Sequence, residues 1–369
     1  MPETHQTTSQ DPLSKNRPAY VAGMGMITSI GFNAAMTAAS VKAGISGYQS
    51  SDFFNEGAEQ ITMATVPESV FSLFTVEEED DDLYSIQYDR IIKMAILAIH
   101  EALSNIQIKQ TIPLILAVPE DRERDNYVPL DLLISKLLQQ EELPFKVEHI
   151  RFVSTGRAGR IQALEIAKQY LYEQGSNYVL VGASDSYVEA SRLSAIDNTK
   201  RLLAPNRMDG FVAGEGAGFM LLTQRPDAAM IKNNHVVAIS SPGFAQESGH
   251  LYSDETYKGD GLDQAFKKAL RDYTGANIGV VYSSMNGENY WAKEYGVAMI
   301  RNKKHFKESV SIEHPADCYG DLGAATGPVL LGLSACELFK QTENKANLVY
   351  SSSDSGWRAA VRMEKIALV

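Results

Sequence analysis

Cysteine is scarce in this chain. Only Cys318 and Cys336 occur among its 369 residues, which excludes a disulfide framework and a zinc site built from cysteines. We interpret both as buried thiols of the protein interior, and we predict that the chain uses no metal and no cofactor. So few cysteines are typical of proteins in a reducing compartment, and we expect a cytoplasmic protein.

Basic residues are also fewer than acidic ones. Lys and Arg number 34 against 46 Asp and Glu, for a formal net charge of −12. This excess of acid opposes a general attraction to nucleic acid or to an anionic membrane surface. The chain also lacks any apolar run of the roughly 18 residues that cross a bilayer. We therefore predict partners among proteins and small molecules, without nucleic acid and without membrane insertion.

Two polar segments lack the periodicity of helices and strands. Residues 1–18 have no apolar core of the kind found in a signal peptide, and we predict a disordered tail. Residues 46–83 contain the six consecutive acids Glu77-Glu-Glu-Asp-Asp-Asp82, whose mutual repulsion favours a solvated loop. A metal site or a docking site for a basic partner is the alternative for this acidic run.

The rest of the chain alternates between strand and helix patterns. We predict strands at residues 20–23, 113–118, 147–154, 178–181, 235–240, 279–283, 309–312 and 347–350, and helices at residues 33–43, 88–103, 130–138, 160–174, 262–273 and 324–339. Residues 211–222 read as a hairpin-like stretch. This alternation predicts an α/β fold. Because the order of elements restarts after the hairpin-like stretch, we predict an N-terminal half at 19–230 and a C-terminal half at 231–369.

Five small-residue motifs follow one another across nearly the whole chain. They are Val21-Ala-Gly-Met-Gly-Met-Ile-Thr-Ser-Ile-Gly31, Ala43-Gly-Ile-Ser-Gly47, Tyr178-Val-Leu-Val-Gly-Ala183, Arg207-Met-Asp-Gly-Phe-Val-Ala-Gly-Glu-Gly-Ala-Gly218 and Leu322-Gly-Ala-Ala-Thr-Gly327. In order and spacing they resemble the motifs of β-ketoacyl-acyl-carrier-protein synthases, which belong to the thiolase-like superfamily. The resemblance implies an α/β, thiolase-like five-layer α-β-α-β-α fold from two duplicated halves, with the catalytic pocket between them.

The catalytic residues of that family are missing. Its condensing members need a cysteine thiolate at a helix N-terminus, and here the matching turn Val153-Ser-Thr-Gly-Arg-Ala-Gly-Arg160 carries Arg157. A guanidinium has no usable lone pair for attack on an acyl group. The two histidine loops match stretches that carry Asn286 and Gly320 instead, and none of the seven histidines lies at either position. The resemblance therefore implies a degenerate member without the Cys-His-His triad, a pseudoenzyme without condensing activity.

The replacements suggest a charged pocket. Asp354 falls where the family has a gating phenylalanine, so the pocket mouth is expected to be polar. The family geometry would bring together the candidate pocket residues Arg157, Arg160, Asn286, Glu288, Cys318, Asp321 and Asp354. Either internal Arg-carboxylate pairs close the pocket, or Arg157 and Arg160 hold an anion or carboxylate ligand. Thioester chemistry at Cys318 is a further alternative. Glu215 matches a family glutamate with a structural role.

We therefore expect function through protein contacts, in fatty acid or polyketide biosynthesis or in another pathway. A heterodimer with an active ketosynthase, as formed by chain-length factors, and a homodimeric scaffold or adaptor both fit, with an acyl carrier protein as a further partner. Chain-length factors usually carry glutamine at the cysteine position, which Arg157 does not match. An acyltransferase-like enzyme using residues outside the family set and an anion-binding protein are the alternatives. In the thiolase fold the strand at 147–154 is a sheet edge, and its Ile150 and Phe152 predict a dimer through this strand.

Overall fold

The computed structural model describes residues 17–72, 86–120, 129–140, 142–205, 207–274, 278–342 and 346–368. The side chains of residues 86, 87 and 160 also lie outside this description. Most of the predicted N-terminal tail and the acidic run at residues 77–82 therefore fall outside the described residues. Within the described ranges, no helix is both long enough and apolar enough to cross a membrane.

The N-terminal half forms one half of a large mixed sheet. Its strands are β1 (Ala19–Thr28), β4 (Leu114–Ala117), β5 (Ile150–Val153), β6 (Tyr178–Ser186) and β7 (Ala213–Thr223), which lie in the order β5-β4-β6-β7-β1. The strands β5, β4 and β6 run parallel to one another, whereas β7 is antiparallel to both β6 and β1. The strand β5 is therefore an edge of the sheet.

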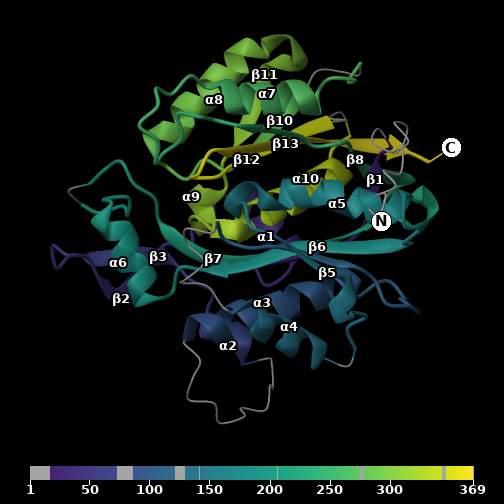
Figure 1. Ribbon diagram of the computed structural model, residues 1–369, viewed down its shortest axis with the longest axis horizontal. Helices are drawn as coiled ribbons and strands as arrows, with labels where there is room; N and C mark the ends of the chain where they lie inside the picture. The colour runs from purple at the N-terminus through teal and green to yellow at the C-terminus, as the bar shows by residue number, and fades with distance from the viewer. Residues whose placement is uncertain are drawn as a thin grey trace, which may run out of the picture.

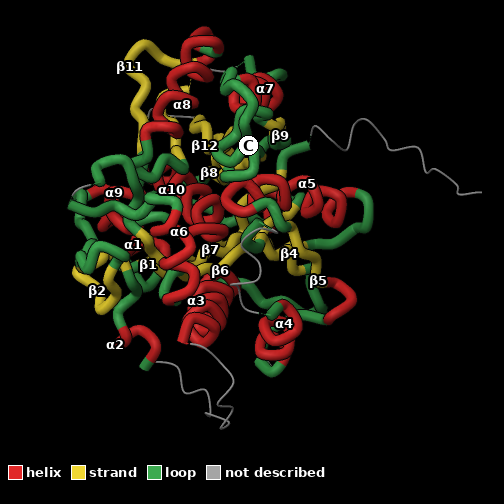
Figure 2. The backbone as a smooth tube through the Cα atoms, turned by 60° about the vertical axis from the view of Figure 1, so that its left-hand side comes forward, coloured by secondary structure: helices red, strands yellow, loops and turns green. Residues whose placement is uncertain are grey.

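The C-terminal half repeats this arrangement. Its strands β8 (His235–Ile239), β10 (Ile278–Ser283), β11 (Phe306–Glu313), β12 (Ala346–Ser352) and β13 (Trp357–Ala367) lie in the equivalent order β11-β10-β12-β13-β8, with the same pattern of directions. The halves join where the start of β1 pairs with the end of β8. A short strand β9 (Gly243–Gln246) adds to β13. The edge strands β5 and β11 lie at opposite ends of the molecule (Figure 2).

Helices complete five layers. Figure 1 shows α7 (Asp260–Ala269) and α8 (Asn289–Arg301) outside one half-sheet, and α3 (Ile86–Leu103) and α4 (Leu130–Leu138) outside the other. Between the two half-sheets lie α5 (Gly159–Tyr172), α10 (Thr326–Lys340) and α1 (Ala34–Lys42). The described residues also form the helices α2 (Glu68–Phe71), α6 (Ala190–Asn198) and α9 (Ala316–Tyr319) and several 3-10 turns, among them η4 (Pro226–Ala228) and η5 (Lys303–His305). The predicted α-β-α-β-α architecture is confirmed.

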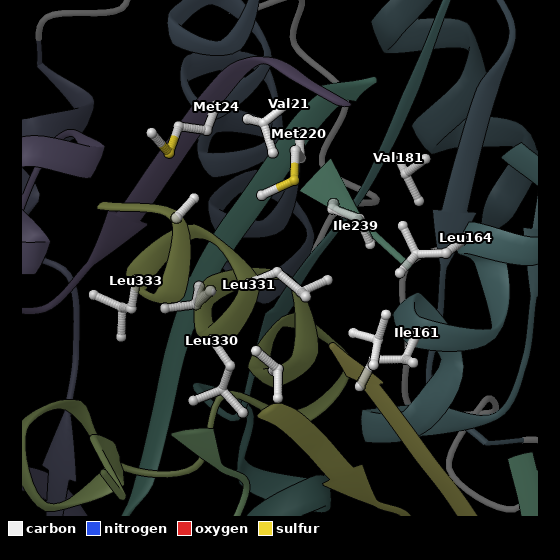
Figure 3. Close-up of a cluster of buried hydrophobic side chains, with 14 of the residues drawn as sticks. Val21, Met24, Ile161, Leu164, Val181, Met220, Ile239, Leu330, Leu331 and Leu333 are labelled. Atoms are coloured by element: carbon white, nitrogen blue, oxygen red, sulfur yellow. The ribbon is translucent and has the colours of Figure 1, made fainter. Parts of the chain in front are cut away.

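The main core surrounds α10. This helix is apolar on nearly all sides because sheet or helix covers each of them. In Figure 3 its Leu330, Leu331 and Leu333 lie beside side chains of β1, β7 and α5. The backbone of β7 approaches α10 closely, since a Cβ at Gly218 would lie 2.8 Å from the Cβ of Pro328. The small residues of the sequence motifs thus bring the layers into contact.

Several predicted elements need correction. The predicted loop at 46–83 contains a hairpin of β2 (Gln49–Phe54) and β3 (Gln60–Ala64) followed by α2, where the polar sequence hid the short strands. The prediction of a hairpin-like stretch at 211–222 is wrong, because β7 is one continuous strand between β1 and β6. Its glycines accommodate close neighbours rather than a turn. The strand expected at 147–154 starts only at Ile150, after a 3-10 turn η2 (Val147–His149).

Candidate functional site

The two central helices begin beside each other, between the half-sheets. A 3-10 turn η3 (Gly156–Ala158) leads into α5, and the equivalent turn η6 (Gly323–Ala325) leads into α10. Gly156 and Gly323 have φ of 57° and 54°, a conformation that favours glycine. A Cβ at Gly323 would also lie 2.1 Å from an oxygen of Asp185. The duplicated turns place Arg157 of one half against the loop that carries Asp321 in the other.

Arg157 is buried between the halves, with 5% of its surface exposed. Its Nε donates to the carbonyl oxygen of Ser352 at 3.0 Å, and one Nη donates to Asp321 at 2.5 Å. The other Nη donates to Asp354. The guanidinium carbon lies 4.7 Å from the ring centroid of Trp291, within cation-π range. The cation is therefore held by three acceptors and an aromatic face.

A second arginine, Arg201, completes the cluster. Its Nε and one Nη form a bidentate pair with Glu288 at 2.7 and 2.8 Å, the geometry in which a guanidinium binds a carboxylate most strongly. The other Nη donates to Asp354 at 2.5 Å and to the Tyr252 hydroxyl at 2.9 Å. Asp354 thus bridges the two arginines. Arg201 lies in the loop after α6, where no sequence pattern set it apart from a surface arginine.

Asn286 bridges the carboxylates of Asp321 and Glu288. Its Nδ2 donates to Asp321 at 2.7 Å and to Glu288 at 3.1 Å. The backbone N–H of Gly323 donates to the second oxygen of Asp321 at 2.8 Å. We call Arg157, Arg201, Asn286, Glu288, Asp321 and Asp354 the Arg157 cluster. It contains two cations and three anions, and every one of these side chains has partners within the cluster.

Arg157, Arg201 and Asp354 are charged at ordinary pH. Burial alone would raise the pKa of Asp354, but the charges of Arg157 and Arg201 outweigh it and lower that pKa to about 2. Burial lowers the pKa of both arginines, yet the charges of the neighbouring carboxylates more than compensate and leave each raised. Neither arginine can supply a lone pair, and Asp354 cannot act as an acid near neutral pH.

The space beside the cluster is closed. A small cavity lined by Asn286, Gly320, Asp321 and Tyr319 has no room for a water molecule. A second buried ion pair lies next to Trp291. Arg358 donates to Glu294 at 2.5 Å, and the guanidinium carbon of Arg358 lies 5.4 Å from the Trp291 ring centroid. Trp291 therefore contacts the guanidinium groups of both Arg157 and Arg358. No group of histidine, cysteine and carboxylate side chains among the described residues is arranged to hold a metal ion.

The structure brings together most of the predicted pocket residues. Arg157, Asn286, Glu288, Asp321 and Asp354 are in direct contact, as described above, and Gly320 lines the adjacent cavity. The side chain of Arg160 lies outside the described residues, so its expected role as an anion ligand stays a prediction.

Cys318 is placed elsewhere. It lies in α9, buried in the main hydrophobic core, and among the described residues no bond joins its thiol to the Arg157 cluster. Burial, followed by the charges of Asp317 and Glu313, raises the pKa of this thiol. A thiolate is the reactive form of cysteine, so this environment makes Cys318 less nucleophilic. Burial likewise raises the pKa of Cys336 to about 11.

Glu215 lies on β7 and is fully buried. Its carboxylate accepts from the Nε of Arg90 on α3 at 2.9 Å, from the Val66 N–H at 2.7 Å and from the Ser186 hydroxyl at 2.7 Å. Arg90 also pairs with Glu68 on α2. The carboxylate of Glu215 thus links β7 with α3 and with the segment before α2. The sequence did not reveal Arg90 as its partner, because the two residues lie 125 positions apart.

The fold is that of ketosynthases. No family model matches the chain, and no curated protein matches it by sequence. Among solved structures it is similar to the ishigamide ketosynthase/chain length factor, with a TM-score of 0.72 and 16% identity over 95% of this chain and 99% of that chain. It is also similar to a ketosynthase (ApeO) in complex with its chain length factor (ApeC) from Xenorhabdus doucetiae, with a TM-score of 0.67 and 15% identity over 97% and 100%.

A modular ketosynthase gives the same result. The ketosynthase from module 6 of the bacillaene synthase from Bacillus subtilis 168 matches with a TM-score of 0.75 and 13% identity, over 95% of this chain and 72% of that chain. At such low identities the likeness establishes the fold and leaves the chemistry to be argued from the site. The thiolase-like ketosynthase fold expected from the sequence motifs is confirmed.

Proposed function

We propose that this chain, which has the thiolase-like ketosynthase fold, is a non-condensing protein that acts through protein contacts, as the partner subunit of an active ketosynthase. One observation carries the proposal. At the N-terminus of α5, where the resemblance places the nucleophile, Arg157 is buried and bonded to Asp321, Asp354 and the Ser352 carbonyl.

The chemistry of that position supports the absence of condensation. Acyl transfer in this fold needs a nucleophile and proton donors around an open space. Arg157 supplies no nucleophile, and Asn286 is already bonded to two carboxylates. A substrate carbonyl would have to displace buried ion pairs to reach the helix N-terminus, and breaking such pairs is costly. The same internal pairing occupies Arg157 and Arg201, the two arginines of the cluster whose side chains the structure describes, so we favour the closed pseudo-site.

Contact with a second ketosynthase-fold subunit is supported by the fold. Two of the similar structures are named as ketosynthases with chain length factors. In this chain β5 is the edge strand of the N-terminal half-sheet, paired on one side by β4. An edge strand carries backbone groups that can pair with another chain. Pairing through β5 would give a dimer with a two-fold axis, either with an active ketosynthase or with a second copy.

Two measurements test the proposal. The purified chain is assayed for decarboxylation of a malonyl thioester and for condensation with an acyl thioester, beside an active ketosynthase as the positive control. We expect no turnover above a heat-denatured sample. Arg157→Cys should also show none, since catalytic residues that act as a unit are strongly non-additive and the histidines would still be missing.

The chain is then co-expressed with a ketosynthase from the same host, one of the two subunits carrying an affinity tag. Co-purification as a stoichiometric complex supports the partner role. A homodimer that never exchanges with the ketosynthase would favour the scaffold instead, and turnover by the unmodified chain would refute the non-condensing assignment.

A further inference from the structure

A second cleft lies at the other end of α5. It has a volume of about 550 Å³, within the range of small-molecule sites, and is open to solvent. The C-terminal part of α5, the segment after β8, the end of α7 and β13 form its walls. Lys168 on α5 is 11 residues beyond Arg157, or about 16 Å along a helix. The cleft is therefore distinct from the Arg157 cluster.

Lys168 is the buried amine of this cleft. Only 7% of the residue is exposed, which is unusual for lysine. Its Nζ donates to the hydroxyl of Ser241 at 2.6 Å, so the end of the side chain is held at the wall formed by the segment after β8. Pro242, Phe244 and Ala269 supply apolar surface nearby. The cleft thus combines a positioned amine with a small apolar patch among largely polar and charged walls.

We infer that Lys168 is a nucleophilic amine that forms an imine with a small aldehyde or ketone bound in the α5–α7 cleft. The nitrogen lone pair attacks the carbonyl carbon, and the electron pair of the C=O bond moves to oxygen. The two amine protons leave with that oxygen as water, and a carbon-nitrogen double bond remains. No oxidant or reductant is needed, and the released water has an open path to solvent.

The protonation state of Lys168 favours this reaction. Burial lowers the pKa of Lys168 to about 8, against a smaller opposing effect from Glu165. At pH 7.5 an amine with such a pKa is roughly one-quarter neutral, whereas an ordinary lysine is about 0.1% neutral. Intrinsic nucleophilicity falls with pKa, so we expect a net advantage of roughly tenfold. The charged groups around the cleft are Glu165, Glu173, Lys268, Arg271, Asp272 and Arg362.

Reductive trapping tests this inference. The purified full chain is incubated at pH 7.5 with a limiting amount of benzaldehyde and sodium cyanoborohydride, which converts an imine to a stable secondary amine. Peptide mapping by mass spectrometry then compares Lys168 with Lys268, which lines the same cleft but is exposed, and with Lys307 on β11. We expect Lys168 to react roughly tenfold faster than either.

Two variants sharpen the result. Lys168→Arg keeps the charge and should lose this adduct while the other lysines react as before. Glu165→Gln removes a charge that raises the pKa of Lys168, so the labelling profile should move to lower pH. Equal reaction at all three lysines, or no adduct at Lys168, would overturn the inference. The comparison within the unmodified chain remains decisive even where a variant folds poorly.

Discussion

Replacement of Arg157 by methionine tests whether the Arg157 cluster holds the two halves together. The change removes three donors from the interface: one to the Ser352 carbonyl, one to Asp321 and one to Asp354. Asp354 keeps Arg201 and the Tyr252 hydroxyl, but among the described residues Asp321 keeps only Asn286 and the Gly323 N–H. Methionine roughly fills the volume of the aliphatic stem, so the main effect is electrostatic.

The expected cost follows from the burial of the pair. Arg157 and Asp321 have side chains that are 6% and 1% exposed, so water cannot solvate the carboxylate that is left. Removing one partner of a buried ion pair typically costs about 3–5 kcal/mol. We expect Arg157→Met to lower the free energy of unfolding by about this amount. Arg157→Met combined with Asp321→Asn should recover part of the loss, because it removes the unpaired charge.

The measurement is urea unfolding at pH 7, followed by far-ultraviolet circular dichroism. The matched control is Arg225→Met, because Arg225 pairs with Asp227 in an exposed ion pair of the same kind, with side chains 59% and 66% exposed. Surface pairs of this type contribute little, and we expect no measurable change. A loss of less than about 1 kcal/mol for Arg157→Met, or a double variant no better than the single one, would refute the reasoning.

Three further outcomes are expected. The pKa of Asp354 is lowered from 3.8 to about 2 in the fold. Its charged form therefore contributes about 2 kcal/mol to the free energy of unfolding, a contribution that is complete above about pH 4 and disappears as pH falls through 2. The difference in stability between the unmodified chain and Asp354→Asn should shrink over that range in acid titrations. Phe152→Pro should dissociate a β5-mediated dimer in sedimentation experiments, whereas Phe152→Leu should not, and a dimer insensitive to proline would place the interface elsewhere. Arg90→Met leaves the fully buried Glu215 without its arginine partner and should lower the free energy of unfolding by about 3–5 kcal/mol in the same urea assay. An unchanged free energy of unfolding would show that the remaining hydrogen bonds of Glu215 are sufficient.

The sequence by itself indicated the fold, because the order and spacing of its motifs resemble those of ketosynthases, and the structural likeness confirms that fold. The motifs Arg207–Gly218 and Leu322–Gly327 carried part of that resemblance, and the structure shows why small residues occur there, since strand and helix pack closely at Gly218. The type of residue at position 157 also needs no coordinates to interpret, because a guanidinium cannot act as an acyl nucleophile in any fold. These features are local, and the sequence displays them directly.

The tertiary structure alone decided which charges meet. Arg157 and Asp354 are separated by 197 residues and Arg201 and Glu288 by 87, so their pairing depends on how the two halves pack. The same holds for Arg90 with Glu215, and for the amine of Lys168 beside the segment after β8. A charged residue in a sequence looks the same whether solvent or a carboxylate faces it. Burial removes solvent as a partner, and only the arrangement of distant loops determines what replaces it.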